Sequence, residues 1–112
     1  MALSRYLTEM GMGVDVHGGD YTKAAKRAVS DALRHSSLNF FKHLDKRKDD
    51  MRLQVIIGVA KPEQVDTVAV ARELPYGTAE VTATKGGLNV PAEQRDDLMV
   101  IANAAILVCF DE

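Results

Sequence analysis

The residues with the clearest chemical potential lie in one stretch, Gly11 to Asp20, which contains four glycines, two aspartates and a histidine. In an extended backbone side chains repeat with a period of two, so Asp15 and His17 would project to the same side. An aspartate beside a histidine orients the ring, and such a pair can perform general acid/base chemistry. Asp15 and His17 are therefore the catalytic candidates, and whether the protein is an enzyme stays open.

The same stretch predicts a ligand site, because it joins an expected strand to an expected helix. Glycines let the backbone approach a ligand closely, and a helix N-terminus attracts anions. Lys85, just before Gly86-Gly87, could add a cation. The alternative is a structural turn in which Asp20 only caps the helix. The predicted ligand-binding residues are Gly11, Gly13, Gly18, Gly19, Asp20 and Lys85.

Common cofactor motifs are not matched. The dinucleotide pattern Gly-x-Gly-x-x-Gly would need glycine where Val16 stands, and no phosphate-binding Gly-Lys-Ser/Thr follows. His35 and His43 have no metal-ligand spacing, which argues against a structural zinc site. The sequence thus leaves the cofactor, if any, unknown.

The hydrophobic pattern predicts one α/β (α+β) domain spanning residues 1–112. Paired apolar residues recur every four positions from Tyr21 to about Ser36, which indicates a helix capped by Asp20 or Thr22. A weaker helix is expected over 65–74 and a short helical segment over 38–44. Strands are expected over 4–14, 51–60, 78–85 and 98–110.

The resulting order, β-α-β-α-β-β, predicts a mixed four-stranded sheet with helices on one face, its last two strands forming a hairpin with a long loop. The apolar segments 51–60 and 98–110 are typical of strands covered on both faces. Since two helices can cover only one face, we expect a homo-oligomer.

Composition narrows the partners and the location. A net charge of −2 gives no electrostatic reason to bind nucleic acid or an anionic membrane. The single cysteine, Cys109, lies in an apolar run and cannot form an internal disulfide, which favours a reducing compartment. No segment approaches the roughly 20 apolar residues of a membrane span, and no secretory signal is evident at the N-terminus. These observations predict a cytoplasmic protein.

The motif Gly-x-Gly-x-Asp-x-His-Gly at 11–18, with Leu74-Pro-Tyr-Gly77, Gly86-Gly87 and Ile101-Ala-Asn-Ala-Ala105, resembles a family of conserved hypothetical proteins found in bacteria and plants. The resemblance spans nearly the whole chain and implies a shared site without naming a substrate. The strand order also resembles the chorismate-mutase-like architecture and the C-terminal domain of tubulin-type proteins, an analogy of fold that transfers no activity.

Two functions are therefore expected from the sequence. The first is binding of a small polar or anionic metabolite at the Gly11 to Asp20 turn, with acid/base chemistry by His17 and Asp15. The alternative is a non-catalytic oligomeric module, structural or regulatory, in which the glycine stretch only shapes a turn. They differ in whether Asp15 and His17 are exposed or buried in hydrogen bonds.

Overall fold

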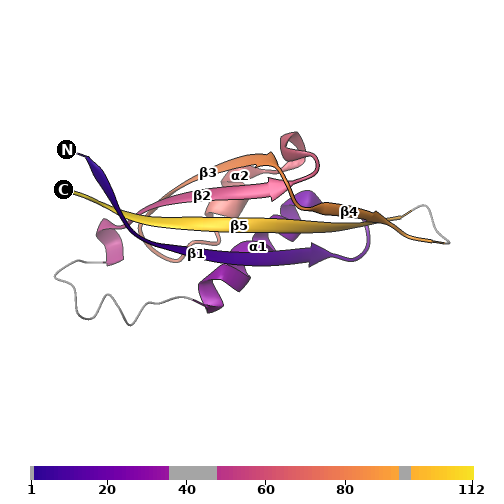
Figure 1. The fold of residues 1–112 in the computed structure, drawn as a ribbon, viewed down its shortest axis with the longest axis horizontal. Coiled ribbons are helices and arrows are strands. Elements are labelled where there is room, and N and C mark those ends of the chain that lie inside the picture. Colours follow the sequence, from indigo (N-terminus) through magenta and orange to yellow (C-terminus); the bar gives the residue numbers. More distant parts are fainter. Residues whose placement is uncertain (1, 36–47, 94–96) are drawn as a thin grey trace.

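The computed structural model describes residues 2–35, 48–93 and 97–112. Within these ranges the chain forms a five-stranded mixed sheet, two α-helices and two short 3₁₀ turns, which confirms the predicted class (Figure 1). In chain order the strands and α-helices are β1 Leu3–Asp15, α1 Tyr21–Arg34, β2 Arg52–Val59, α2 Thr67–Ala71, β3 Thr78–Lys85, β4 Leu88–Pro91 and β5 Leu98–Asp111.

The long strand β5 lies at the centre of the sheet. It pairs antiparallel with β1 on one side and with β2 and then β4 on the other, while β3 runs parallel to β2 at the far edge. The predicted hairpin between the two last long strands is therefore wrong, because β2 separates β3 from β5 and the short β4 forms the hairpin instead. A four-residue strand ending in Pro91 gives too weak a pattern to be seen in the sequence.

Glycines allow the chain to cross from β3 to β4. Gly86 passes so close to Gly58 of β2 that a Cβ on Gly86 would lie 3.1 Å from the Gly58 Cα atom. Gly87 has a φ of 63°, and a Cβ there would lie 2.1 Å from the carbonyl oxygen of Ile101. Gly86-Gly87, which follow the strand predicted over 78–85, thus form a close crossing over the end of β2.

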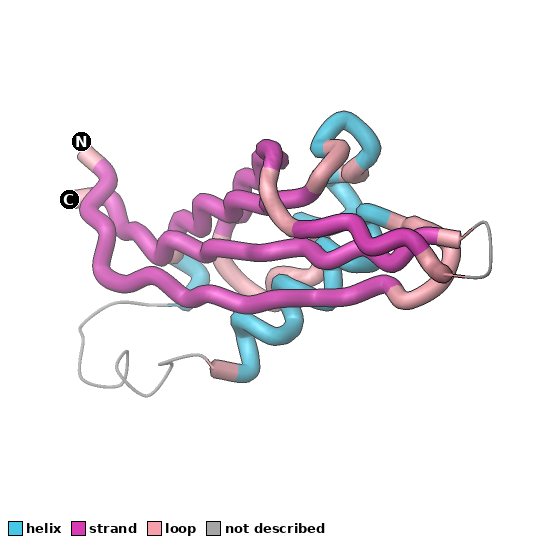
Figure 2. Tube along the Cα trace, turned by 45° about the vertical axis from the view of Figure 1, so that its right-hand side comes forward, coloured by secondary structure: helices cyan, strands magenta, loops and turns pink. Residues whose placement is uncertain are grey.

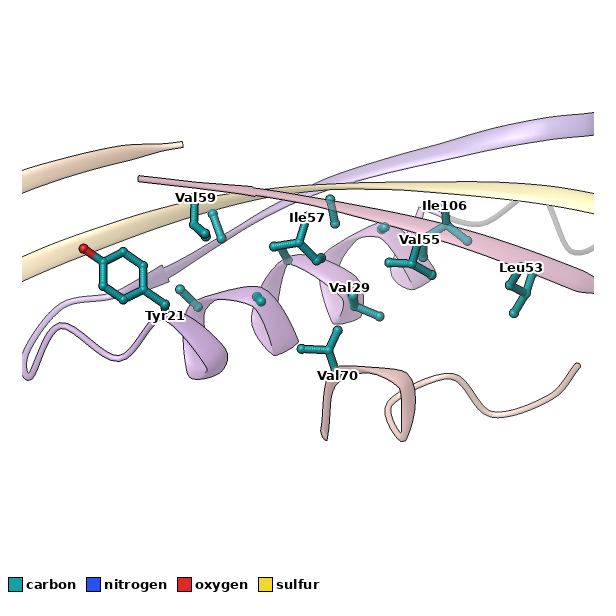
Figure 3. Close-up of a cluster of buried hydrophobic side chains, with 14 of the residues drawn as sticks. Tyr21, Val29, Leu53, Val55, Ile57, Val59, Val70 and Ile106 are labelled. Carbon is teal, nitrogen blue, oxygen red and sulfur yellow. The ribbon is translucent and has the colours of Figure 1, made fainter. Parts of the chain in front are cut away.

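Helix α1 covers one face of the sheet, as its apolar stripe predicts. Ala24, Ala25, Ala28, Val29 and Ala32 are completely buried. They meet alternate residues of β2 and β5, and Figure 3 shows Val29 between these strands and α2. The small alanines let the helix lie close to the sheet, with the labelled β2 side chains Leu53, Val55, Ile57 and Val59 above it.

Helix α2 is shorter than predicted. It begins after Asp66, whose Oδ1 accepts the backbone N–H of Ala69 at 3.1 Å, and it ends at Ala71, with only Val70 buried. Its single buried residue explains why the apolar pattern was weak. The helical segment predicted over 38–44 lies outside the described residues.

Both helices pack on the same side of the sheet (Figure 2). On β2, Leu53 and Val55 are buried while Gln54 and Ile56 are exposed, so the expectation that this strand is covered on both faces is wrong for the single chain. Exposed hydrophobic side chains gather on the side away from the helices, which we call the open face: Met10, Met12, Ile56, Leu88 and Val90.

Candidate functional site

The predicted turn joins β1 to α1 through residues 16–20. Gly18 and Gly19 have φ values of 94° and 61°, a left-handed conformation that side chains other than glycine rarely adopt. A Cβ on Gly18 would meet only Asp15 Oδ2, at 3.9 Å, so its backbone faces open space. These two glycines therefore serve the shape of the turn.

His17 extends from this turn and is held by a residue that the sequence analysis missed. Its Nδ1 lies 2.9 Å from Oδ2 of Asp97, just ahead of β5. Oδ1 of Asp97 accepts the backbone N–H of Gly18 at 2.9 Å and that of Leu98 at 2.8 Å. The carboxylate thus connects the turn to the start of the central strand, while the His17 side chain stays 62% exposed.

These contacts fix the charge and the tautomer of the pair. The backbone N–H of Gly18, followed by the His17 side chain and the backbone N–H of Leu98, lowers the pKa of Asp97 to about 2. An ionised carboxylate only accepts hydrogen bonds, so Nδ1 of His17 must carry the proton that it donates. In the neutral ring Nε2 is then an acceptor, free to take a proton or a hydrogen bond.

Asp15 is hydrogen-bonded to the turn backbone rather than to His17. It is 2% exposed at the end of β1, where Oδ2 accepts the backbone N–H of Asp20 at 2.9 Å. Oδ1 lies 3.6 Å from Nη1 of Arg27 and 3.9 Å from Nζ of Lys23, both on α1. The predicted Asp15–His17 hydrogen bond is not formed, because the strand ends at Asp15 and the period of two no longer applies at His17.

Asp20 is the helix cap that the sequence predicted. Its Oδ1 accepts the backbone N–H of Lys23 at 3.0 Å, which satisfies one of the free donors in the first turn of α1. Thr22, the other candidate cap, instead accepts the backbone N–H of Asp66 at 2.9 Å and so connects α1 to the start of α2.

Gly11 and Gly13 lie in β1, beneath the backbone of α1. A Cβ on Gly11 would lie 2.4 Å from the backbone nitrogen of Ala32, and one on Gly13 would lie 2.3 Å from the carbonyl oxygen of Ala24. The helix can approach the strand only because both residues lack a side chain. The first half of the glycine motif therefore serves packing.

Lys85 is not brought to the turn. It ends β3 at the opposite edge of the sheet, with β2 and β5 between it and β1, and three strand spacings correspond to about 14 Å. His35 is exposed and lies 3.2 Å from Asp31 at the other end of α1, and His43 falls outside the described residues. Cys109 is a buried free thiol, as expected.

The start of α1 has a second polar contact that the sequence did not predict. The Nδ2 of Asn89 in β4 donates a 2.6 Å hydrogen bond to the hydroxyl of Tyr21, the first residue of the helix. The Oδ1 of Asn89 is buried and finds no partner among the described residues. The signal for both missed residues was weak, since Asn89 lies in a four-residue strand and Asp97 ends a charged run.

A surface hollow lies at the other end of the sheet. It has a volume of about 310 Å³ between β2, β3 and β5, and its lining includes Arg52, Thr78 and Phe110. Arg52 is engaged there in an ion pair with Asp111, at 3.2 Å. Within the described ranges no group of three His, Cys, Asp or Glu residues could hold a metal ion.

A family model for conserved hypothetical proteins, Lin0512_fam, matches residues 5–108. The chain belongs to this family. It also resembles the crystal structure of an FtsZ-like protein of unknown function from Nostoc punctiforme, with 35% identity, a TM-score of 0.86 and coverage of 100% of this chain and 99% of that one. A search of curated proteins found no match.

The family assignment confirms the resemblance to an uncharacterised family. The family description assigns no role to the motif. In the structure, Gly11 and Gly13 of the motif pack beneath α1, and His17 extends from the turn. No helix in the described part of the chain is long and apolar enough to cross a membrane.

Proposed function

We propose that the Gly11 to Asp20 turn, together with Asp97, binds a small polar molecule, with His17 as the group that accepts its hydrogen bond or proton. The observation that carries this proposal is the 2.9 Å contact between His17 Nδ1 and Asp97, beside a ring that is mostly exposed. A histidine held in one tautomer at the surface is prepared to act as a base.

The chemistry of the turn favours a ligand with a hydroxyl or carboxylic acid group. Such a group can donate its proton to Nε2 of His17, and the ionised Asp97 stabilises the imidazolium that results. Asp97, rather than Asp15, orients the ring in this proposal. Lys23, half exposed on the first turn of α1 and 3.9 Å from Asp15, is a cation of this turn that a ligand carboxylate could contact.

A specific observation also favours the alternative, a non-catalytic module. Asp97 receives hydrogen bonds from Gly18, Leu98 and His17, an arrangement that by itself holds the turn against β5. If this is the whole role of His17, replacing the residue weakens the turn and affects no ligand.

A thermal-shift screen of a polar metabolite library, carried out in parallel on wild type, His17→Ala and His35→Ala, tests the proposal. His35 is a matched control, since it is another exposed histidine beside an aspartate. We expect at least one compound to raise the melting temperature of wild type and His35→Ala but not of His17→Ala. A lowered melting temperature for ligand-free His17→Ala, with no compound that stabilises wild type, would support the structural alternative.

A further inference from the structure

The open face of the sheet has no helix packed on it in the described chain, and its central side chains are uncharged. Met10 and Met12 are 70% and 53% exposed, and Ile56, Leu88 and Val90 are 40%, 56% and 38% exposed. The pairing register places these side chains around Ile101 and Ala105 of β5. In each strand every second side chain points to this face. Between the strand positions that align with Met99 and those that align with Ala105, all of these side chains are uncharged. In the whole chain 27% of the residues are charged.

We propose that this face is covered by a second copy of the chain. A contiguous apolar patch without charge is the composition of an interface core. In a symmetric dimer the same patch of both copies forms the interface. A charged side chain near its centre would therefore lie close to the same charge on the other copy, unless it had a partner of opposite charge. An uncharged patch meets this requirement, whereas a partner of opposite charge would find nothing here to recognise.

Asn103 supports the choice of a second copy. It lies on β5 between Met12 and Gly58, in the middle of the apolar rows, and is exposed. Its side chain makes no hydrogen bond with the rest of the described chain. A primary amide carries both donors and an acceptor, so two asparagines can satisfy each other across a symmetric interface. An amide inside an apolar strand must either be hydrogen-bonded within the fold or lie at the surface, and the structure places Asn103 on the surface.

The size of the face is sufficient for a stable dimer. Between two and four strands, about 4.8 Å apart, share each of the four levels from Met99 to Ala105, which makes roughly 400 Å² of flat sheet. The side chains that stand on it increase the accessible area toward the roughly 800 Å² per partner of a standard interface.

Pairing through the edge of β1 is obstructed near the same end. Asp31 of α1 accepts the outward backbone N–H of Met12 at 2.9 Å, and Arg27 of α1 donates to the carbonyl oxygen of Val14 at 2.6 Å. Two copies therefore cannot extend the sheet at these residues without displacing α1 side chains. Association through the face requires no such change.

Sedimentation equilibrium of the full chain between 5 and 200 µM, a range set by the roughly micromolar affinity of modest interfaces, tests the proposal. We expect a wild-type mass of at least two 12.2 kDa chains. Asn103→Asp, a nearly isosteric change at an exposed position, should raise the dissociation constant by about 30-fold or more, because the interface would bury an unpaired charge. Met10→Glu, on another strand, should have the same effect.

Val68→Glu is the matched control, because Val68 is 62% exposed but lies on α2, on the helix side of the sheet. It should keep the wild-type mass. Far-ultraviolet circular dichroism of each variant checks that the fold is retained. A wild-type chain that remains monomeric at 200 µM would overturn the proposal, and so would folded Asn103→Asp and Met10→Glu variants that associate as wild type does.

Discussion

At the residue scale, the described residues include two exposed histidines paired with aspartates, in different surroundings. Asp31 accepts the backbone N–H of Met12 as well as bonding to His35, and this backbone hydrogen bond is the main cause of the lowered pKa of its carboxyl group. Asp97 accepts two backbone N–H groups besides His17, and both of these bind the same oxygen, Oδ1. The oxygen that faces His17 is thereby fixed, and of these two described pairs it is the one that lies on a glycine turn.

This geometry predicts that Asp97→Asn reverses the tautomer of His17. The amide oxygen of Asn should remain with the N–H groups of Gly18 and Leu98, so its NH₂ group faces Nδ1. Nδ1 then becomes an acceptor and Nε2 carries the proton. Long-range ¹⁵N–¹H spectra of the imidazole rings at a pH where His17 is neutral measure the change. His35 is the internal control, and an unchanged His17 tautomer would contradict the assignment.

Asp97 should also make stability depend on pH in the acid range. Its pKa is about 2 in the folded chain and 3.8 in the reference state, so folding favours the ionised form. The stabilisation is complete above about pH 4, decreases as pH falls toward 2, and is absent below that. The difference in melting temperature between wild type and Asp97→Asn should shrink over this interval. Asp31 shifts in the same direction but is present in both proteins, so a constant difference would show that Asp97 does not titrate as described.

At the element scale, the packing of α1 on β1 explains half of the glycine motif. The stripe of alanines on the helix was visible in the sequence, and so was the cap at Asp20. That the helix rests on Gly11 and Gly13 was not, because a glycine in a sequence does not say whether a ligand or another backbone approaches it.

Gly11→Ala and Gly13→Ala should each destabilise the fold by about 2 kcal/mol or more, since the added methyl group would force α1 away from the strand. Gly58→Ala is the control: its Cβ would be no closer than 3.4 Å to other atoms, and its backbone conformation is not left-handed. We expect that variant to change stability by less than about 1 kcal/mol. Urea denaturation measures all three, and equal costs at Gly13 and Gly58 would contradict the packing role.

The parts of the fold that the sequence predicted are those governed by local periodicity. The apolar stripe of α1 and the β-rich runs of β2, β3 and β5 follow from neighbouring residues. The insertion of β2 between β5 and β3 and the pairing of β4 depend on distant contacts. The candidate site shows the same contrast between local and distant information. His17 could be picked out from its neighbours in the sequence, whereas its partner Asp97 is 80 residues away and no local pattern connects the two.

At the scale of the whole molecule, β5 organises the protein. It is the strand to which β1, β2 and β4 all pair, and its buried residues meet α1 in the core. Its first residues follow Asp97, which holds the candidate site, and its middle residues form the centre of the open face. The site and the proposed interface thus share one rigid element, as the positioning of a reactive side chain requires.

This central position predicts the order of hydrogen exchange. From Asn103 to Cys109, β5 is paired on both sides, by β1 and by β2, so amides of this segment should exchange only when the whole domain unfolds. Amides of β3, at the edge and joined to the sheet by β2 alone, should open locally and exchange much faster. Native-state exchange followed by NMR at several concentrations of urea measures both. If β3 amides were as protected as those of β5, the sheet would unfold as a single unit and β5 would not be its most stable part.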